Sequence, residues 1–188
     1  MEEDKEWVRQ VLSGEKQAYA HLINKYRNKV FSLLYRMTGN PHDAQDLAQE
    51  CFIRAYRYLH SYDENRKFSS WLYRIAVNVY VDTQRSLQKK QVSLVEIEEN
   101  TLSDGNSPET MYLQEEHASE LHELIGQLPE KYRVVLLLRY VDELSYQEIS
   151  DILEIPLHQV QIRLHRAKQR LRNYFQSAEK GGGLHEVL

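Results

Sequence analysis

The chain has 188 residues, of which 41% are hydrophobic and 28% charged, a balance typical of a globular protein rather than a disordered one. No apolar run approaches the roughly 18 residues of a membrane-spanning helix, and the acidic residues 1–10 do not have the pattern of a secretory signal. The single cysteine, Cys51, excludes an internal disulfide and favours a reducing, cytoplasmic location. Seven glycines and four prolines are too few for the many turns of an all-β fold.

Charge is distributed unevenly along the chain. Residues 1–90 carry a net charge of +4, residues 91–120 carry −8 with no Lys or Arg, and residues 121–188 are neutral overall. Residues 158–175 nevertheless contain five basic side chains and no acidic one. The pattern indicates two polyanion-binding regions separated by an acidic strip. The net charge of −4 argues against tight DNA binding by the chain alone.

The first half of the sequence has a helical apolar period. Apolar side chains recur at steps of three and four over residues 19–37, which predicts one long helix that ends at Gly39. Asn40 as the N-cap and Pro41 in the first turn then start a second helix, which runs to about Leu59.

A polar turn at residues 61–66 precedes a third predicted helix, whose apolar period fades after about Lys90. Residues 91–112 are acidic and lack a sustained period, so they are predicted to form a flexible linker. The expected fold is all-α, with one small helical domain at 1–90 and a second at 113–176. Residues 177–188, which include three consecutive glycines, are expected to be a flexible tail.

The second domain contains a predicted helix-turn-helix. Ser145 and Glu148 have the spacing of a capping box, residues 154–156 break the first helix, and a basic helix follows. A recognition helix places polar residues near its start for base edges and cations further on for phosphates. The alternative is an amphipathic helix with a solvated basic face. The candidates for DNA contact are His158, Gln159, Gln161, Arg163, Arg166, Lys168 and Arg170.

The third helix allows two interpretations. Phe68 and Trp71 lie on its apolar stripe and are most simply core residues. Alternatively, this helix and the turn before it hold unpaired DNA, since aromatic stacking and hydrogen bonds offset the few kcal/mol that unstacking a base costs. The polar side chains that could supply those hydrogen bonds are Ser61, Asp63, Asn65, Arg66 and Ser69.

The second helix presents an acidic face at Asp43, Asp46 and Glu50. This face is either a solvated stripe, with Glu50 and Arg54 spaced as an ion pair, or a docking surface for a basic partner. A metal site is disfavoured because a single helix offers no ligand from a second element. No Ser, Cys or His stands in a recognisable catalytic arrangement, so no enzyme activity, metal or cofactor is expected.

Five segments, in order and at matching separations, resemble the extracytoplasmic-function (ECF, group IV) sigma factors of the sigma-70 family. Residues 39–56 resemble the polymerase-binding segment, and Phe68-Ser-Ser-Trp-Leu-Tyr-Arg-Ile-Ala-Val-Asn78 resembles the helix that melts the promoter and reads its −10 element. Residues 128–133, 144–149 and 163–168 resemble the domain that reads the −35 element. The resemblance covers about residues 5–175.

The resemblance implies a cytoplasmic subunit with a sigma-2-like helical bundle and a sigma-4-like helix-turn-helix domain. Its partners would be bacterial RNA polymerase core, contacted at the β′ clamp and the β flap, promoter DNA and an anti-sigma factor. Direct membrane insertion is not expected. The acidic linker would thread through the positively charged RNA channel of the polymerase.

The family pattern also implies site residues. Polymerase core would be bound by Asp43, Asp46, Gln49, Glu50 and Arg54. The −10 element would be recognised and melted by Ser61, Asp63, Asn65, Arg66, Lys67, Phe68, Trp71, Arg74 and Asn78. The −35 element would be bound by His158, Gln159, Gln161, Arg163, Arg166, Lys168 and Arg170.

The sequence departs from the family where −35 specificity is determined. Many members have Gly-Thr-Val-Lys-Ser-Arg at the start of the recognition helix, and only Val160 and Arg163 of that pattern are kept here. The −35 sequence therefore cannot be transferred from relatives. Two other functions are compatible with parts of the chain: a stand-alone helix-turn-helix repressor with an N-terminal sensing domain, and an enzyme fused to a DNA-binding unit.

Overall fold

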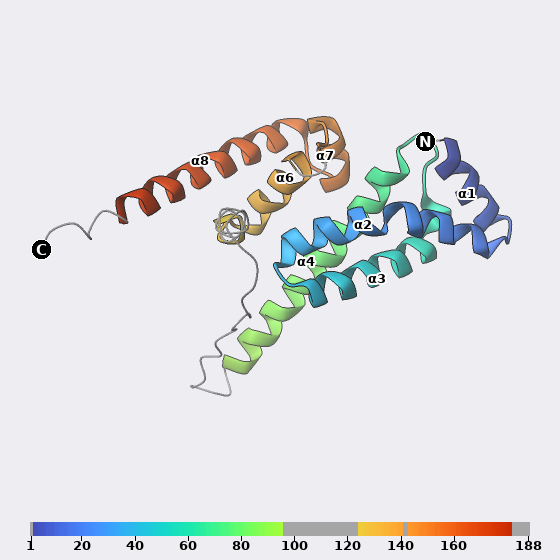
Figure 1. The fold of residues 1–188 in the computed structure, drawn as a ribbon, viewed down its shortest axis with the longest axis horizontal. Helices are drawn as coiled ribbons and strands as arrows, with labels where there is room; N and C mark the ends of the chain where they lie inside the picture. Colours follow the sequence, from blue (N-terminus) through green and yellow to red (C-terminus); the bar gives the residue numbers. More distant parts are fainter. Residues whose placement is uncertain (1, 96–123, 141–142, 182–188) are drawn as a thin grey trace, which may run out of the picture.

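A computed structural model describes residues 2–95, 124–140 and 143–181, and every regular element in these ranges is helical (Figure 1). This confirms the predicted all-α fold. The N-terminal lobe consists of α1 (Glu2–Leu12), α2 (Tyr19–Thr38), α3 (Pro41–Arg57) and α4 (Phe68–Val95), with short 3₁₀ turns at Lys16–Ala18 and Leu59–Ser61. The C-terminal lobe consists of α6 (Glu130–Tyr140), α7 (Tyr146–Leu153) and α8 (Leu157–Gly181).

The corner between α2 and α3 has the predicted caps. Gly39 adopts a left-handed conformation with φ of 74° and donates its N–H to the carbonyl of Tyr35 at 2.8 Å. The Asn40 side chain then accepts hydrogen bonds from the backbone N–H groups of His42 and Asp43 at 2.8 and 3.3 Å. These bonds satisfy donors that the first turn of α3 cannot pair within the helix, so two helices meet at a sharp corner.

The core of the N-terminal lobe is formed by the apolar stripes of α2, α3 and α4. Leu22 and Leu33 of α2, Cys51 of α3, and Leu72 and Val79 of α4 are all fully buried. Burial also raises the pKa of the Cys51 thiol to about 12, which makes it a poor nucleophile at neutral pH. Cys51 is therefore a core residue.

Helix α1 is fastened to α2 by a buried carboxylate. Asp4 is only 3% exposed; it accepts a hydrogen bond from Lys25 at 2.7 Å and another from the hydroxyl of Tyr26 at 3.1 Å. Lys25 also lies 5.2 Å from the centre of the Trp7 ring. The sequence reasoning assigned no role to α1, and these contacts show that it is part of the lobe.

The C-terminal lobe has the predicted helix-turn-helix geometry. The Ser145 hydroxyl accepts from the backbone N–H of Glu148 at 3.2 Å, and the Glu148 carboxylate accepts from the backbone N–H of Ser145 at 2.9 Å. This confirms the capping box. Glu154 ends α7 in a left-handed conformation with φ of 51°, and α8 follows after Pro156.

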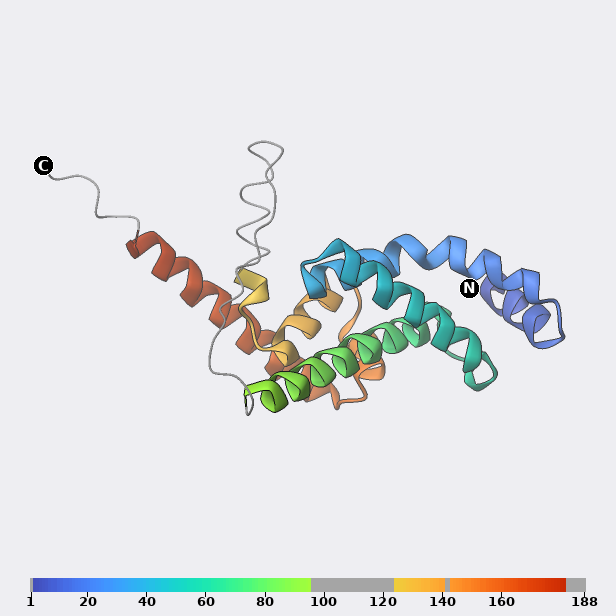
Figure 2. The same cartoon turned by 90° about the horizontal axis from the view of Figure 1, so that it is seen from below.

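The two lobes pack against each other, which the sequence did not predict. Helix α6 lies against α2 and α7 lies against α4 (Figures 1 and 2). Val134, Leu137 and Leu144 belong to the same buried cluster as the core of the N-terminal lobe. Across the boundary, Arg133 donates to the backbone carbonyl of Met37 at 3.4 Å. Both views show α8 pointing away from the N-terminal lobe.

Two helices extend further than the apolar period suggested. Helix α4 continues through Val95, into the segment assigned to the linker, and α8 continues through Gly181, into the segment assigned to the tail. The rest of both assigned segments, 96–112 and 182–188, lies outside the described residues. Within the described residues, no helix is both long and apolar enough to cross a bilayer.

Candidate nucleic-acid interface

The solvent-facing side of α8 carries most of the predicted −35 residues. His158, Gln159 and Gln161 are exposed in its first turns, whereas Val160 and Leu164 face the core. Arg163 is only half-exposed. The first turns of the helix therefore present imidazole and amide groups, which can donate to and accept from base edges.

The predicted phosphate-binding cations lie beside tyrosine rings of α6. The Lys168 ammonium is 5.3 Å from the centre of the Tyr140 ring, and the Arg170 guanidinium is 5.4 Å from that of Tyr132. The pKa of Tyr132 is below its usual value, chiefly because Arg166 donates a hydrogen bond to its hydroxyl. These contacts restrict the rotamers of long side chains before any DNA binds, which reduces the entropy lost on binding.

Two residues on the same face were missed from the sequence. Ile162 is 43% exposed and His165 is exposed, and both follow Gln161 within about one turn of α8. The sequence does contain a signal for Ile162: it is an apolar residue outside the buried stripe of Val160, Leu164 and Ala167, which indicates an exposed apolar side chain. An exposed apolar side chain at this place is suited to contact a thymine methyl group.

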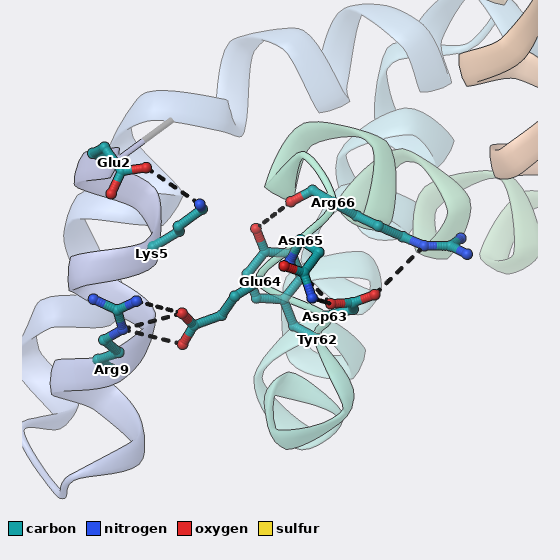
Figure 3. A network of polar contacts seen from close by, with 8 residues as sticks. All are labelled: Glu2, Lys5, Arg9, Tyr62, Asp63, Glu64, Asn65 and Arg66. Atoms are coloured by element: carbon teal, nitrogen blue, oxygen red, sulfur yellow. Dashed lines mark hydrogen bonds and ion pairs between the residues drawn. The ribbon is translucent and has the colours of Figure 1, made fainter.

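The turn before α4 is held by its own side chains (Figure 3). Asp63 accepts from the backbone N–H of Asn65 at 2.9 Å and from its side-chain amide at 3.0 Å. The Tyr62 hydroxyl donates to the carbonyl of Arg66 at 2.6 Å. The sequence proposed hydrogen bonds from this turn to DNA, and the structure shows that Asp63 already supports the backbone of the turn.

The same turn is joined to α1 by an ion pair. Arg9 of α1 donates to Glu64 through both Nε and Nη2 (Figure 3). The pKa of the Glu64 carboxyl is below its usual value, chiefly because of this hydrogen bond. Ser61, Asn65 and Arg66 remain exposed, so the turn offers polar groups to solvent from a braced backbone.

The aromatic pair of α4 is divided by burial. Phe68 is 2% exposed, and its ring centre lies 5.4 Å from those of Tyr26 and Tyr62. Phe68 therefore belongs to the core in this conformation, which corrects its assignment to the DNA-contacting set. Trp71 is half-buried: it packs against the core and also lines a cleft of about 520 Å³. The core interpretation of Trp71 thus holds in part, and its contact with DNA stays a prediction.

The cleft beside Trp71 lies between the lobes. Its N-terminal side contains Asn65, Arg66, Lys67, Ser70, Trp71 and Arg74. Its C-terminal side contains Ser145, Gln147, Glu148 and Asp151. Two ion pairs cross the boundary, from Lys67 to Glu148 and from Arg74 to Glu154. Asn78, further along α4, is exposed.

The outer face of α3 has exposed polar side chains near its start and ion-paired side chains further along. Asp43, Asp46 and Gln49 are exposed, as a docking surface requires. Arg54 instead donates to Glu50 at 2.7 Å and to Asp82 of α4 at 2.8 Å. Arg54 and Glu50, both predicted docking residues, therefore also take part in a network that holds α3 against α4.

Apolar side chains follow the acidic ones on α3. Ile53 and Tyr56 are 47% and 39% exposed and line a shallow groove with Tyr19 and Phe52. The sequence reasoning missed both, although Ile53 follows Asp46 and Gln49 at steps of seven and four, on the same helical face. The face therefore combines carboxylates with an apolar end, as protein-binding surfaces often do.

Comparison with known proteins agrees with this geometry. Residues 22–90 match the family model for sigma-70 region 2, and residues 118–171 match that for sigma-70 region 4. The chain is 41% identical to the ECF RNA polymerase sigma factor SigW of Bacillus subtilis over 176 residues, 89% of this chain and 94% of SigW. It is 36% identical to the ECF sigma-E factor of Escherichia coli K12 over 92% of this chain and 94% of that protein.

Solved structures show the same fold. CnrH, in complex with the cytosolic domain of CnrY, matches with a TM-score of 0.70 and 20% identity over 93% of this chain and 98% of CnrH. RpoE of Bartonella quintana, in complex with the anti-sigma factor NepR, matches with a TM-score of 0.67 and 15% identity over 84% of this chain and 96% of RpoE.

Two matched regions, each on its own lobe, define the class as the sigma factors of the sigma-70 family. Within that class, the identity to SigW and sigma-E over nearly their whole length shows that this chain belongs to the ECF sigma factors. It is an alternative sigma factor. A stand-alone repressor would leave the region 2 match unexplained. Among the described residues, no three His, Cys, Asp or Glu side chains gather as a metal site.

Proposed function

We propose that each lobe carries one promoter contact and that α3 carries the polymerase contact. The observation on which this rests is the exposure of three surfaces on separate elements: the carboxylates of α3, the polar turn before α4, and the amide-rich start of α8. The chain acts by binding and by opening DNA, without covalent catalysis, and it works in the cytoplasm.

Promoter opening depends on the turn at residues 61–67 and on Trp71. Unstacking one base costs a few kcal/mol, and stacking on an aromatic ring returns about 1–3 kcal/mol. Hydrogen bonds from Ser61, Asn65 and Arg66 supply the remainder. Phe68 contributes indirectly, since its buried ring supports Tyr62 and Trp71 from below. Lys67, Arg74 and Asn78 contact the adjacent backbone.

The acidic segment between the lobes fits a positively charged channel. Residues 91–120 carry a net charge of −8, which DNA repels and which a channel built for RNA attracts. We therefore assign the part of the predicted linker that follows α4 to the path between the lobes through the polymerase, with the C-terminal lobe on the β flap.

An anti-sigma factor is a further proposed partner. RpoE of Bartonella quintana is bound to the anti-sigma factor NepR in its structure, and its fold is that of this chain. The exposed apolar side chains Ile53 and Tyr56 offer a surface that such a partner and polymerase core would compete for.

The assignment of α3 is tested by charge reversal. Asp46→Lys should lower the affinity for RNA polymerase core about tenfold or more, because a carboxylate facing a basic surface becomes a like charge. Transcription from a promoter library should fall with it. Glu15→Lys makes the same charge change at an exposed site outside α3 and should leave both unchanged. Equal core affinity for the two variants would contradict the assignment, and failure of the unmodified chain to bind core would overturn the proposed function.

A further inference from the structure

The two ends of α7 are fastened to the first turns of α4. Lys67, immediately before α4, pairs with Glu148 in the first turn of α7. Arg74, two turns further along α4, pairs with Glu154 at the C-terminal end of α7. Both N···O distances are 2.5 Å. The two cations that the proposed function gives to DNA phosphates are therefore occupied by carboxylates of the other lobe.

The space that a nucleotide would enter is also bounded by the other lobe. The cleft of about 520 Å³ has Arg66 and Trp71 on its N-terminal side, and Gln147 and Asp151 of α7 form the opposite side. Carboxylates carry negative charge as the phosphates of a nucleic-acid strand do, and side-chain amides donate and accept hydrogen bonds as base edges do. The surface of α7 thus reproduces the charge and hydrogen-bonding groups of a strand on the predicted −10 surface.

The contact extends beyond the two ion pairs. Leu144, just before α7, is 9% exposed and packs in the core cluster shared by the lobes. Arg133 of α6 donates to the carbonyl of Met37 at the end of α2. The pKa of Glu148 is below its usual value, chiefly through its hydrogen bond with Lys67, so this carboxyl group is ionised at neutral pH. These contacts hold α7 over the cleft as part of a packed interface.

We infer that α7 is an internal competitor for the −10 strand: in the free chain its ends pair with Lys67 and Arg74 and its side chains form one wall of the Trp71 cleft, and DNA gains access only when the lobes separate on polymerase core. The inference rests on the proposed −10 role of these residues. It accounts for core-dependent promoter binding without requiring another protein to block the site.

The first experiment detects the contact itself. A water-soluble carbodiimide joins an ammonium and a carboxylate only when they are in direct contact. With the full chain alone, peptide mapping should recover an amide between Lys67 and Glu148. The same treatment of the chain bound to polymerase core should recover little of it. Absence of this cross-link from the free chain, or an equal yield on core, would overturn the inference.

The second experiment releases the contact while keeping the helix. The double variant Glu148→Gln/Glu154→Gln removes both carboxylate charges, and Gln at position 148 preserves the capping box. A fluorescein-labelled pool of random single-stranded DNA is the probe. In the absence of core, the variant should bind this DNA roughly two- to thirtyfold more tightly than the unmodified chain. This range corresponds to the free energy that two exposed ion pairs contribute.

A matched control separates this effect from net charge. Glu6→Gln/Glu15→Gln changes the charge by the same amount at exposed sites in and after α1, away from the lobe boundary. Its DNA affinity should stay close to that of the unmodified chain, and an equal gain in both double variants would overturn the inference. All three chains should support the same transcription with core. If the cross-link forms but the unmodified chain cannot transcribe with core, the proposed function fails independently of the contact.

Discussion

Lys168 and Arg170 of α8 lie against the rings of Tyr140 and Tyr132 in their own lobe. By contrast, Lys67 pairs with a carboxylate of the other lobe. The difference has a direct consequence for DNA binding. A cation on an aromatic face keeps a side open to a phosphate, whereas a cation in an ion pair must first lose its partner. At the scale of single residues, the cations of the proposed −35 surface are therefore accessible in the free chain, whereas Lys67 of the proposed −10 surface is paired.

Arg166 is the residue at which the −35 contact is best tested. Arg166→Ala should weaken binding of the core-assembled chain to duplex DNA for all promoter sequences, because a phosphate contact carries no sequence information. The slope of log affinity against log salt concentration should become shallower by about 0.9, which is the contribution of one phosphate contact. Fluorescence anisotropy at several salt concentrations measures both. Lys131→Ala removes an exposed cation of α6 and should not change the slope; an unchanged slope for Arg166→Ala would remove this residue from the contact.

At the scale of elements, short-range capping interactions determine where several helices begin and end. Gly39 and Asn40 turn the chain between α2 and α3, and Ser145 with Glu148 starts α7. The α3 cap has a functional consequence, because it determines the helical phase in which Asp43 and Asp46 face solvent. Loss of the cap should let the first turn of α3 fray, and the carboxylates proposed to bind polymerase begin in this turn.

Asn40→Ala should lower the free energy of unfolding by about 0.5–2 kcal/mol, the usual cost of losing an N-cap side chain. Urea denaturation followed by circular dichroism gives the value. Gln45→Ala is the control, since Gln45 is exposed on the same helix and alanine is a good helix former. If both variants are equally stable, the hydrogen bonds from His42 and Asp43 to Asn40 do not stabilise the corner.

At the scale of the whole molecule, the two lobes share one buried cluster although they carry separate DNA surfaces. In this arrangement α8 projects away from the N-terminal lobe while α7 lies against α4. The proposed −10 surface therefore faces α7 while the proposed −35 surface is exposed. Together with the net charge of −4, this predicts a poor DNA binder until a partner separates the lobes.

The chain alone should bind a duplex carrying both promoter elements only weakly and in a strongly salt-dependent manner. Addition of polymerase core should raise the affinity by about 10³-fold, the lower end of the usual gap between specific and non-specific binding. Electrophoretic mobility shifts with the chain, with core and with both together make the comparison. A tight, sequence-specific shift by the chain alone would show that the packed lobes already read the promoter.

Capping and periodicity involve residues no more than a few positions apart, so the sequence by itself determined the helical class, the corner at Gly39 and the capping box of α7. The order of the motifs likewise indicated the family. Burial and ion pairing depend on residues far apart in the chain: Arg54 meets Asp82 across 28 positions and Lys67 meets Glu148 across 81. Only the tertiary structure could decide that Phe68 is buried, that Trp71 borders a cleft, and that α7 lies against α4, because each depends on how the helices pack.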